Sequence, residues 1–157
     1  MRVHIATDHA GLELSAALID SLSAKGYEMV NHGPVDYDAE DDYPGFCINA
    51  AQAVVRDQAA GVDALGIVLG GSGNGEQISA NKVEGVRAAL VWNTETAKLA
   101  REHNDANVVA VGGRQHSVEE ATALIEAFLT EPFSNAARHQ RRIGKIAAYE
   151  TTGEVPA

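Results

Sequence analysis

The sequence predicts an α/β protein: a three-layer α/β/α sandwich around a mostly parallel sheet of five strands. Two observations lead to this fold class. Short apolar runs rich in β-branched residues alternate along the chain with longer segments of helical period. Strands that are apolar on both faces and separated by helices form parallel sheets covered on both sides, as in Rossmann-like folds. The pattern does not reveal the order of the strands.

The elements are predicted in chain order from their apolar period. Strands are expected at residues 3–6, 27–31, 65–69, 86–91 and 108–111. Helices are expected at residues 12–25, 44–56, 94–102, 118–129 and 134–149. The first helix carries a stripe of leucines at i, i+4 spacing and ends at Gly26, and Thr94 and Ser117 are predicted N-caps.

Length and composition favour one domain, residues 1–150, followed by a flexible tail of residues 151–157. The formal net charge of -10 argues against binding to nucleic acid or to anionic membranes, because both require a basic surface. Cys47 is the single cysteine, so no intrachain disulfide can form, and a reducing compartment such as the cytoplasm is expected. No stretch resembles a signal peptide or reaches the roughly 18 apolar residues that a membrane span needs, so we expect a soluble protein.

Polar or glycine-rich segments follow three of the predicted strands. Asp8 and His9 follow the first strand, residues 70–76 follow the third, and residues 112–114 follow the fifth. In open α/β sheets, ligands bind at the carboxyl ends of the strands. These three segments are therefore expected to meet at one edge of the sheet and to form the functional site.

The segment after the third strand is a glycine-rich turn, Gly70-Gly71-Ser72-Gly73-Asn74-Gly75, followed by Glu76. Its amide groups can turn inward without Cβ obstruction and bind an anion or a developing oxyanion. The turn lacks the Gly-Lys-Ser/Thr end of a P-loop. It has Glu76 where a dinucleotide-binding motif needs glycine, and Asn74 where a nucleophile elbow needs glycine. The alternative is a glycine-rich turn without chemistry.

Glu76 places a carboxylate at the mouth of this turn. Enediolate chemistry requires such a pairing, because a base takes a proton from the carbon next to a carbonyl while donors stabilise the resulting oxyanion. The sequence thus favours an isomerase that moves a proton between neighbouring carbons, with Glu76 as the base and Ser72 as a further donor. Taken alone, Glu76 could be a solvated carboxylate at a helix start, and Ser72 could be a turn residue.

Histidine and arginine side chains supply further candidates. His9 and His103 can act as acid–base groups near neutral pH, although each could instead be structural. The dense basic segment near the C-terminus places Arg138 and Arg142 on one helix face, and together with Arg114 they could bind a phosphate bidentately. A solvated helix face and nucleic-acid binding are the alternatives, but no aromatic residue interleaves with the arginines.

Six ordered motifs make nearly the whole chain resemble a known family, the ribose-5-phosphate isomerase B group, which includes the galactose-6-phosphate isomerase subunits. They are Asp8-His9-Ala10-Gly11, Asp42-Tyr43-Pro44, Gly71-Ser72-Gly73-Asn74-Gly75 with Asn81-Lys82, Arg101-Glu102-His103-Asn104, Gly112-Gly113-Arg114 and Arg138-His139-Gln140-Arg141-Arg142.

The resemblance implies roles for these residues. Asp8 and His9 would contact the sugar, amides of residues 71–75 would form the anion hole, and His103 would help to open the furanose ring. The remaining substrate-binding candidates are Tyr43, Asn104, Arg114, Arg138, His139 and Arg142, of which the three arginines would hold the phosphate. The resemblance also implies a homodimer or a tetramer with active sites that combine residues of both subunits.

One position departs from the family pattern. Many members carry a cysteine base just before the glycine-rich turn, but here that residue is Gly70. Glu76 is left as the base, and one branch of the family is similar in using a glutamate there. The predicted activity is the interconversion of ribose 5-phosphate and ribulose 5-phosphate without a metal or organic cofactor. A six-carbon aldose phosphate as substrate, or a non-catalytic sugar-phosphate sensor, is the alternative. The acidic loop of residues 36–42 has no assigned role beyond Asp42 and Tyr43.

Overall fold

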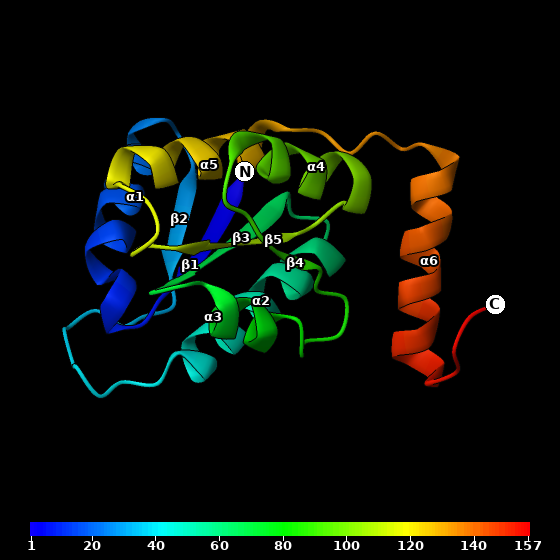
Figure 1. Cartoon of the computed structure of the whole chain (residues 1–157), viewed down its shortest axis with the longest axis horizontal. Helices are drawn as coiled ribbons and strands as arrows, with labels where there is room; N and C mark the ends of the chain where they lie inside the picture. Colours follow the sequence, from blue (N-terminus) through cyan, green and yellow to red (C-terminus); the bar gives the residue numbers. More distant parts are fainter.

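The computed structural model describes residues 1–157 and contains a five-stranded sheet between helices (Figure 1). The strands are β1 (Arg2–Ala6), β2 (Glu28–Asn31), β3 (Ala64–Gly70), β4 (Ala88–Leu90) and β5 (Val108–Gly112). The helices are α1 (Leu12–Ala24), α2 (Tyr43–Ala59), α3 (Asn74–Ala80), α4 (Thr94–Asn104), α5 (Val118–Thr130) and α6 (Ala137–Thr152), together with the 3-10 turn η1 (His9–Gly11). Every strand and helix predicted from the apolar period is present, with ends shifted by a few residues.

All five strands are parallel and lie in the order β2-β1-β3-β5-β4. The central strands β3 and β5 are buried along their whole length, which explains their unbroken apolar sequences. From β1 the chain continues through α1 to β2 on one side, and from β3 it continues through α3 to β4 on the other side. The strand order therefore reverses between β1 and β3, which is where open α/β sheets bind their ligands.

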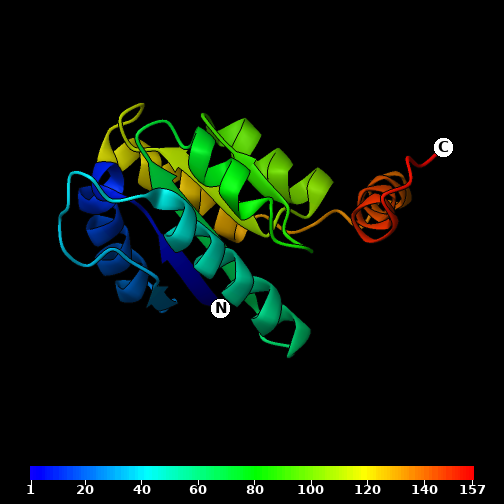
Figure 2. The same ribbon diagram turned by 90° about the horizontal axis from the view of Figure 1, so that it is seen from below.

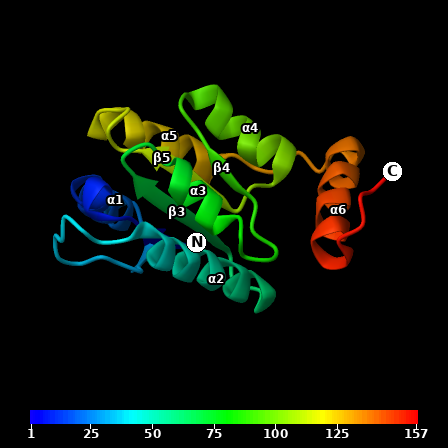
Figure 3. The ribbon, with the colours of Figure 1, turned by 60° about the horizontal axis from the view of Figure 1, so that its bottom comes forward.

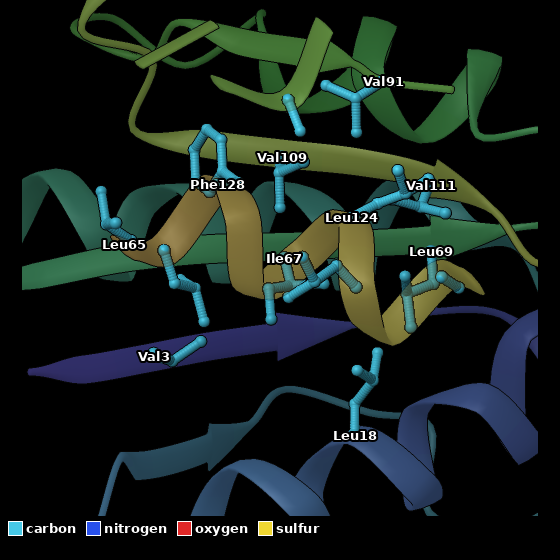
Figure 4. Packing of buried hydrophobic residues seen from close by; sticks show 14 of the residues in the cluster. Val3, Leu18, Leu65, Ile67, Leu69, Val91, Val109, Val111, Leu124 and Phe128 are labelled. Atoms are coloured by element: carbon cyan, nitrogen blue, oxygen red, sulfur yellow. The ribbon is translucent and has the colours of Figure 1, made fainter. Parts of the chain in front are cut away.

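Helices cover both faces of the sheet, which confirms the predicted three layers (Figure 1). Helices α1, α4 and α5 pack on one face in a cluster of 19 buried residues, in which Leu124 and Phe128 of α5 point toward the sheet residues Ile67 and Val109 (Figure 4). Helices α2 and α3 pack on the other face in a cluster of 9 buried residues that includes Cys47. Burial of one large apolar side chain contributes roughly 1.5 to 3 kcal/mol, so the larger cluster supplies most of the apolar stabilisation.

Two local features differ from the prediction. The sequence does not predict α3, because this helix has only 7 residues and begins inside the glycine-rich turn. The N-cap of α4 is Asn93 and not Thr94: the Asn93 side chain accepts a hydrogen bond from the Thr96 backbone N–H at 2.8 Å, and Thr96 returns a bond to Asn93. An asparagine one residue earlier therefore displaces Thr94 from the cap position. The predicted cap Ser117 is confirmed.

The last helix stands apart from the sheet in three views (Figures 1, 2 and 3). Helix α6 runs through Thr151 and Thr152, which the sequence assigns to the tail, and residues 153–157 follow it without regular structure. His139 is its one buried residue, and its main contacts are with α4. No helix of the protein is both long and apolar enough to cross a membrane.

Candidate active site

A cavity of about 500 Å³ lies at the carboxyl edge of the sheet. Its lining residues are Asp8, His9, Ala10, Tyr43, Gly71, Ser72, Gly75, Glu76, Arg114 and Gln115. These residues come from the segments after β1, β3 and β5, and the first residue of α2 adds to the wall. The prediction that the three segments meet at one edge of the sheet is therefore confirmed.

Glycine allows the sharp turn after β3. Gly73 has a φ of +80°, and a Cβ atom there would lie 2.8 Å from the Leu90 side chain. A residue with a side chain would therefore have both an unfavourable backbone angle and too little space. The N–H of Gly113 donates a hydrogen bond to the carbonyl oxygen of Gly70 at 2.7 Å. This bond holds the turn against the segment that follows β5.

Ser72 and Asn74 interact within the turn. The Ser72 hydroxyl oxygen accepts hydrogen bonds from the Asn74 backbone N–H at 3.3 Å and from its side-chain amide at 3.2 Å. Ser72 lines the cavity, whereas Asn74 lines a neighbouring groove, and Gly73 packs against β5 and Leu90. Three of the predicted anion-hole residues thus face the cavity: Gly71, Ser72 and Gly75.

Glu76 lies in the first turn of α3 and lines the cavity, although only 4% of its surface is exposed. Its carboxylate occupies the space that a side chain at Gly70 would need, since a Cβ atom on Gly70 would lie 1.8 Å from Glu76 Oε1. Burial raises the pKa of Glu76, a hydrogen bond from its own backbone amide opposes this shift, and the charge of Asp8 adds to it. A carboxylate with a raised pKa is a stronger base once it is deprotonated, which suits proton abstraction from carbon.

Asp8 and His9 follow β1 in and around the η1 turn. Asp8 Oδ1 caps this turn by accepting a hydrogen bond from the Ala10 N–H at 2.9 Å. His9 is held by Asp41, whose Oδ1 accepts hydrogen bonds from the His9 backbone N–H at 3.0 Å and from Nδ1 at 2.7 Å. Asp8, His9 and Asp41 offer ligand atoms within 4.8 Å of one another, so this is the group that could hold a metal ion. Asp41 could not be recognised from the sequence, because the acidic residues around it look equivalent.

A second group of predicted site residues lies away from this cavity. It consists of His103, Asn104, Arg138, His139 and Arg142. The rings of His103 on α4 and His139 on α6 lie 4.2 Å apart, and α6 stands at the opposite end of the molecule from the carboxyl end of β3 (Figures 1 and 3). Arg114 is the one predicted phosphate ligand that lines the cavity. Within one chain, Arg138 and Arg142 do not meet Arg114, because helical period does not reveal where a terminal helix goes. A phosphate site built from all three arginines stays a prediction for an assembly of chains.

Comparison with known proteins decides the family. A family model described as ribose/galactose isomerase matches residues 3–146. The chain belongs to the ribose/galactose isomerase family. Within this family, the ribose-5-phosphate isomerase B of Mycolicibacterium paratuberculosis is 55% identical over 156 residues, which cover 99% of this chain and 96% of that protein. The resemblance inferred from the six motifs is thereby confirmed.

Two solved structures of the family show the same fold. The ribose-5-phosphate isomerase B of Mycoplasma genitalium with bound ribulose-5-phosphate is 40% identical, with a TM-score of 0.89 over 96% of this chain and 97% of that one. The type B ribose 5-phosphate isomerase of Trypanosoma cruzi is 41% identical, with a TM-score of 0.89 over 98% of each chain.

Cys47, the single cysteine, does not line the cavity. It is fully buried in α2. Burial raises the pKa of Cys47 to about 12, and the charges of Glu76 and Asp8 add to the shift. A thiol with such a pKa remains protonated at neutral pH, so it is unsuited to proton abstraction.

Proposed function

We propose that this chain is a ribose-5-phosphate isomerase that interconverts D-ribose 5-phosphate and D-ribulose 5-phosphate through a cis-enediolate, a reaction of the pentose phosphate pathway. The observation that carries the proposal is the Glu76 carboxylate, buried beside a glycine-rich turn where the strand order reverses. The bound ribulose-5-phosphate of the Mycoplasma genitalium relative supports the choice of substrate. The single Cys47 favours a reducing compartment such as the cytoplasm for this activity.

In the proposed reaction, Glu76 removes the proton from C2 of the open-chain aldose and returns it to C1. The electron pair from the C2–H bond forms the C1–C2 double bond of the enediolate, and a hydroxyl proton passes from O2 to O1 as the ketose forms. The N–H groups of the turn and Ser72 stabilise the oxyanion. A positioned base is worth roughly 100- to 10,000-fold in rate, and one oxyanion donor is worth about 3 to 4 kcal/mol.

The other cavity residues would hold the two ends of the substrate. Arg114 supplies the guanidinium in the cavity and would bind the phosphate. Asp8, His9 and Tyr43 would contact the sugar hydroxyls, since their side chains offer the donors and acceptors that line the same space.

The active form would be a homodimer, or a tetramer built from such dimers, in which a second copy of the chain completes each cavity. The second group of residues supports this arrangement: His103 would protonate the ring oxygen during opening, and Arg138 and Arg142 would join Arg114 at the phosphate. Both arginines are exposed on a helix that stands apart from its own sheet (Figure 1). His139 lies next to Arg138 on α6, Asn104 follows His103 on α4, and both would complete the same contribution.

A six-carbon aldose phosphate is the second candidate substrate, because the family description includes galactose. A non-catalytic sugar-phosphate-binding protein is disfavoured. Such a protein would gain nothing from a buried carboxylate beside its anion site, since the negative charge would repel the ligand.

Purified protein tested against five- and six-carbon aldose phosphates, with deuterium exchange at C2 as a second measurement, distinguishes these possibilities. We expect turnover of ribose 5-phosphate, and we expect Glu76→Gln to abolish both turnover and exchange. The matched control is Glu119→Gln, an exposed carboxylate in the first turn of α5, which should leave both unchanged. Exchange retained in Glu76→Gln would contradict the base assignment, and turnover of six-carbon substrates alone would favour the second candidate.

A further inference from the structure

One residue of the acidic loop, Asp41, contacts His9, which lines the active-site cavity. The side chain of Asp41 is 9% exposed, whereas the other acidic side chains of residues 36–42 are exposed. Asp41 Oδ1 accepts two hydrogen bonds from His9, at 3.0 Å from the backbone N–H and at 2.7 Å from Nδ1. Asp41 Oδ2 is buried without a hydrogen-bond partner. An unpaired buried carboxylate oxygen lowers stability, so the contribution of Asp41 lies in what Oδ1 does to His9.

The contact with Asp41 decides which ring nitrogen of His9 carries the proton. A carboxylate oxygen can only accept, so Nδ1 must donate, and in the neutral ring Nε2 is left as an acceptor. Nε2 has no hydrogen-bond partner within the chain, and His9 lines the cavity. The ring of Tyr37 meets the His9 ring edge-on at a centroid distance of 6.0 Å, which restricts rotation of the imidazole on that side.

We propose that Asp41 is a positioning residue that holds the His9 ring with Nδ1 protonated, so that Nε2 faces the sugar phosphate in the cavity. This inference rests on the proposed function. A ring held in this way presents Nε2 to a ligand in the cavity, where Arg114 supplies the guanidinium. Asp41 thereby fixes how the His9 ring faces the substrate.

Nitrogen-15 NMR of the histidine rings reads this tautomer without any measurement of activity. The chain has 6 histidines, and His9→Gln identifies the signals of His9. At a pH at which the ring is neutral, the wild type should show a protonated Nδ1 and an unprotonated Nε2. Asp41→Ala should shift His9 toward the Nε2–H form. Asp36→Ala, which removes an exposed charge from the same loop, is the matched control and should change nothing.

Asp41→Asn separates the tautomer from the negative charge. The His9 backbone N–H can only donate, so the amide oxygen of the new side chain must take the place of Oδ1 and remains available to Nδ1. This variant should keep the Nδ1–H tautomer and should be more active than Asp41→Ala. If Asp41 only stabilises the fold, both variants will lose activity in proportion to their loss of thermal stability, and the proposal fails.

Kinetics complete the test. With ribose 5-phosphate, kcat/KM should fall about 10- to 100-fold in Asp41→Ala, by analogy with the carboxylate partners that orient metal-bound histidines. The variant His9→Ala/Asp41→Ala should be no slower than His9→Ala, because Asp41 acts through His9. An unchanged tautomer in Asp41→Ala, or an additive loss in the double variant, would overturn the proposal. A wild type that turns over no sugar phosphate would instead refute the proposed function, and the NMR result would still decide whether Asp41 orients His9.

Discussion

Gly70→Ala adds a single methyl group at the end of β3, in the space that the Glu76 carboxylate occupies. The new Cβ atom would lie 1.8 Å from Glu76 Oε1, 2.2 Å from Cδ and 2.7 Å from Oε2. No rotation of the terminal carboxylate alone relieves three such contacts, because Cδ itself is too close. The variant must therefore move the proposed base away from its position.

The size of this displacement sets the expected loss. The carboxylate must retreat by roughly 1.5 Å to restore ordinary van der Waals contact. A misplacement of about 1 Å can cost on the order of 100-fold in rate, and loss of a positioned base costs about 100- to 10,000-fold. We expect kcat to fall within this range, with a smaller change in KM because Arg114 is untouched. Overpacking should also lower the free energy of unfolding by about 1 to 3 kcal/mol.

Steady-state kinetics with ribose 5-phosphate and thermal denaturation measure the two effects. Gly113→Ala is the matched control, because a Cβ atom there would meet nothing closer than 3.4 Å. Adding Glu76→Ala to Gly70→Ala removes the colliding carboxylate, so the double variant should regain stability but not activity. A Gly70→Ala enzyme with the wild-type kcat would refute the reasoning, since catalysis would then not depend on where the Glu76 carboxylate lies.

Charge, burial and the arrangement of α6 lead to three further predictions. Glu76→Gln should raise the melting temperature at neutral pH, because burial raises the pKa of Glu76. Between the ordinary and the raised pKa, the folded state binds more protons than the unfolded state. The wild-type protein therefore loses stability as pH rises through that window, whereas the uncharged glutamine does not. Melting curves should show this difference vanish at acid pH, and a variant less stable than wild type at neutral pH would contradict it. A thiol reagent at mildly alkaline pH should label Cys47 only after unfolding, because burial raises its pKa to about 12; rapid labelling of the native protein would show that the thiol is accessible. Arg142→Ala should raise KM more than it lowers kcat. Mixing Arg142→Ala chains with Glu76→Gln chains should give an activity above that of either variant alone. No such restoration would argue against sites shared between two chains.

Much of the fold and part of the site are predictable because they depend on local pattern. Buried parallel strands are apolar throughout, so β3 and β5 stand out in the sequence, and the carboxyl ends of parallel strands share one edge of the sheet. For this reason, the order of motifs along the chain is enough to place Asp8, Glu76 and Arg114 at one edge of the sheet. The glycine-rich turn is equally visible, since only glycine tolerates the backbone at Gly73.

The amino-acid sequence alone thus establishes the class of fold, the turn with its carboxylate, and the edge of the sheet at which they lie. The strand order, the choice of Asp41 as the partner of His9, and the separation of α6 from the cavity emerge only in the folded chain. These features depend on contacts between segments far apart in the chain. Asp41 lies 32 residues from His9 and looks like its acidic neighbours until the folded loop buries it, and the course of α6 depends on surfaces that its own helical period does not encode.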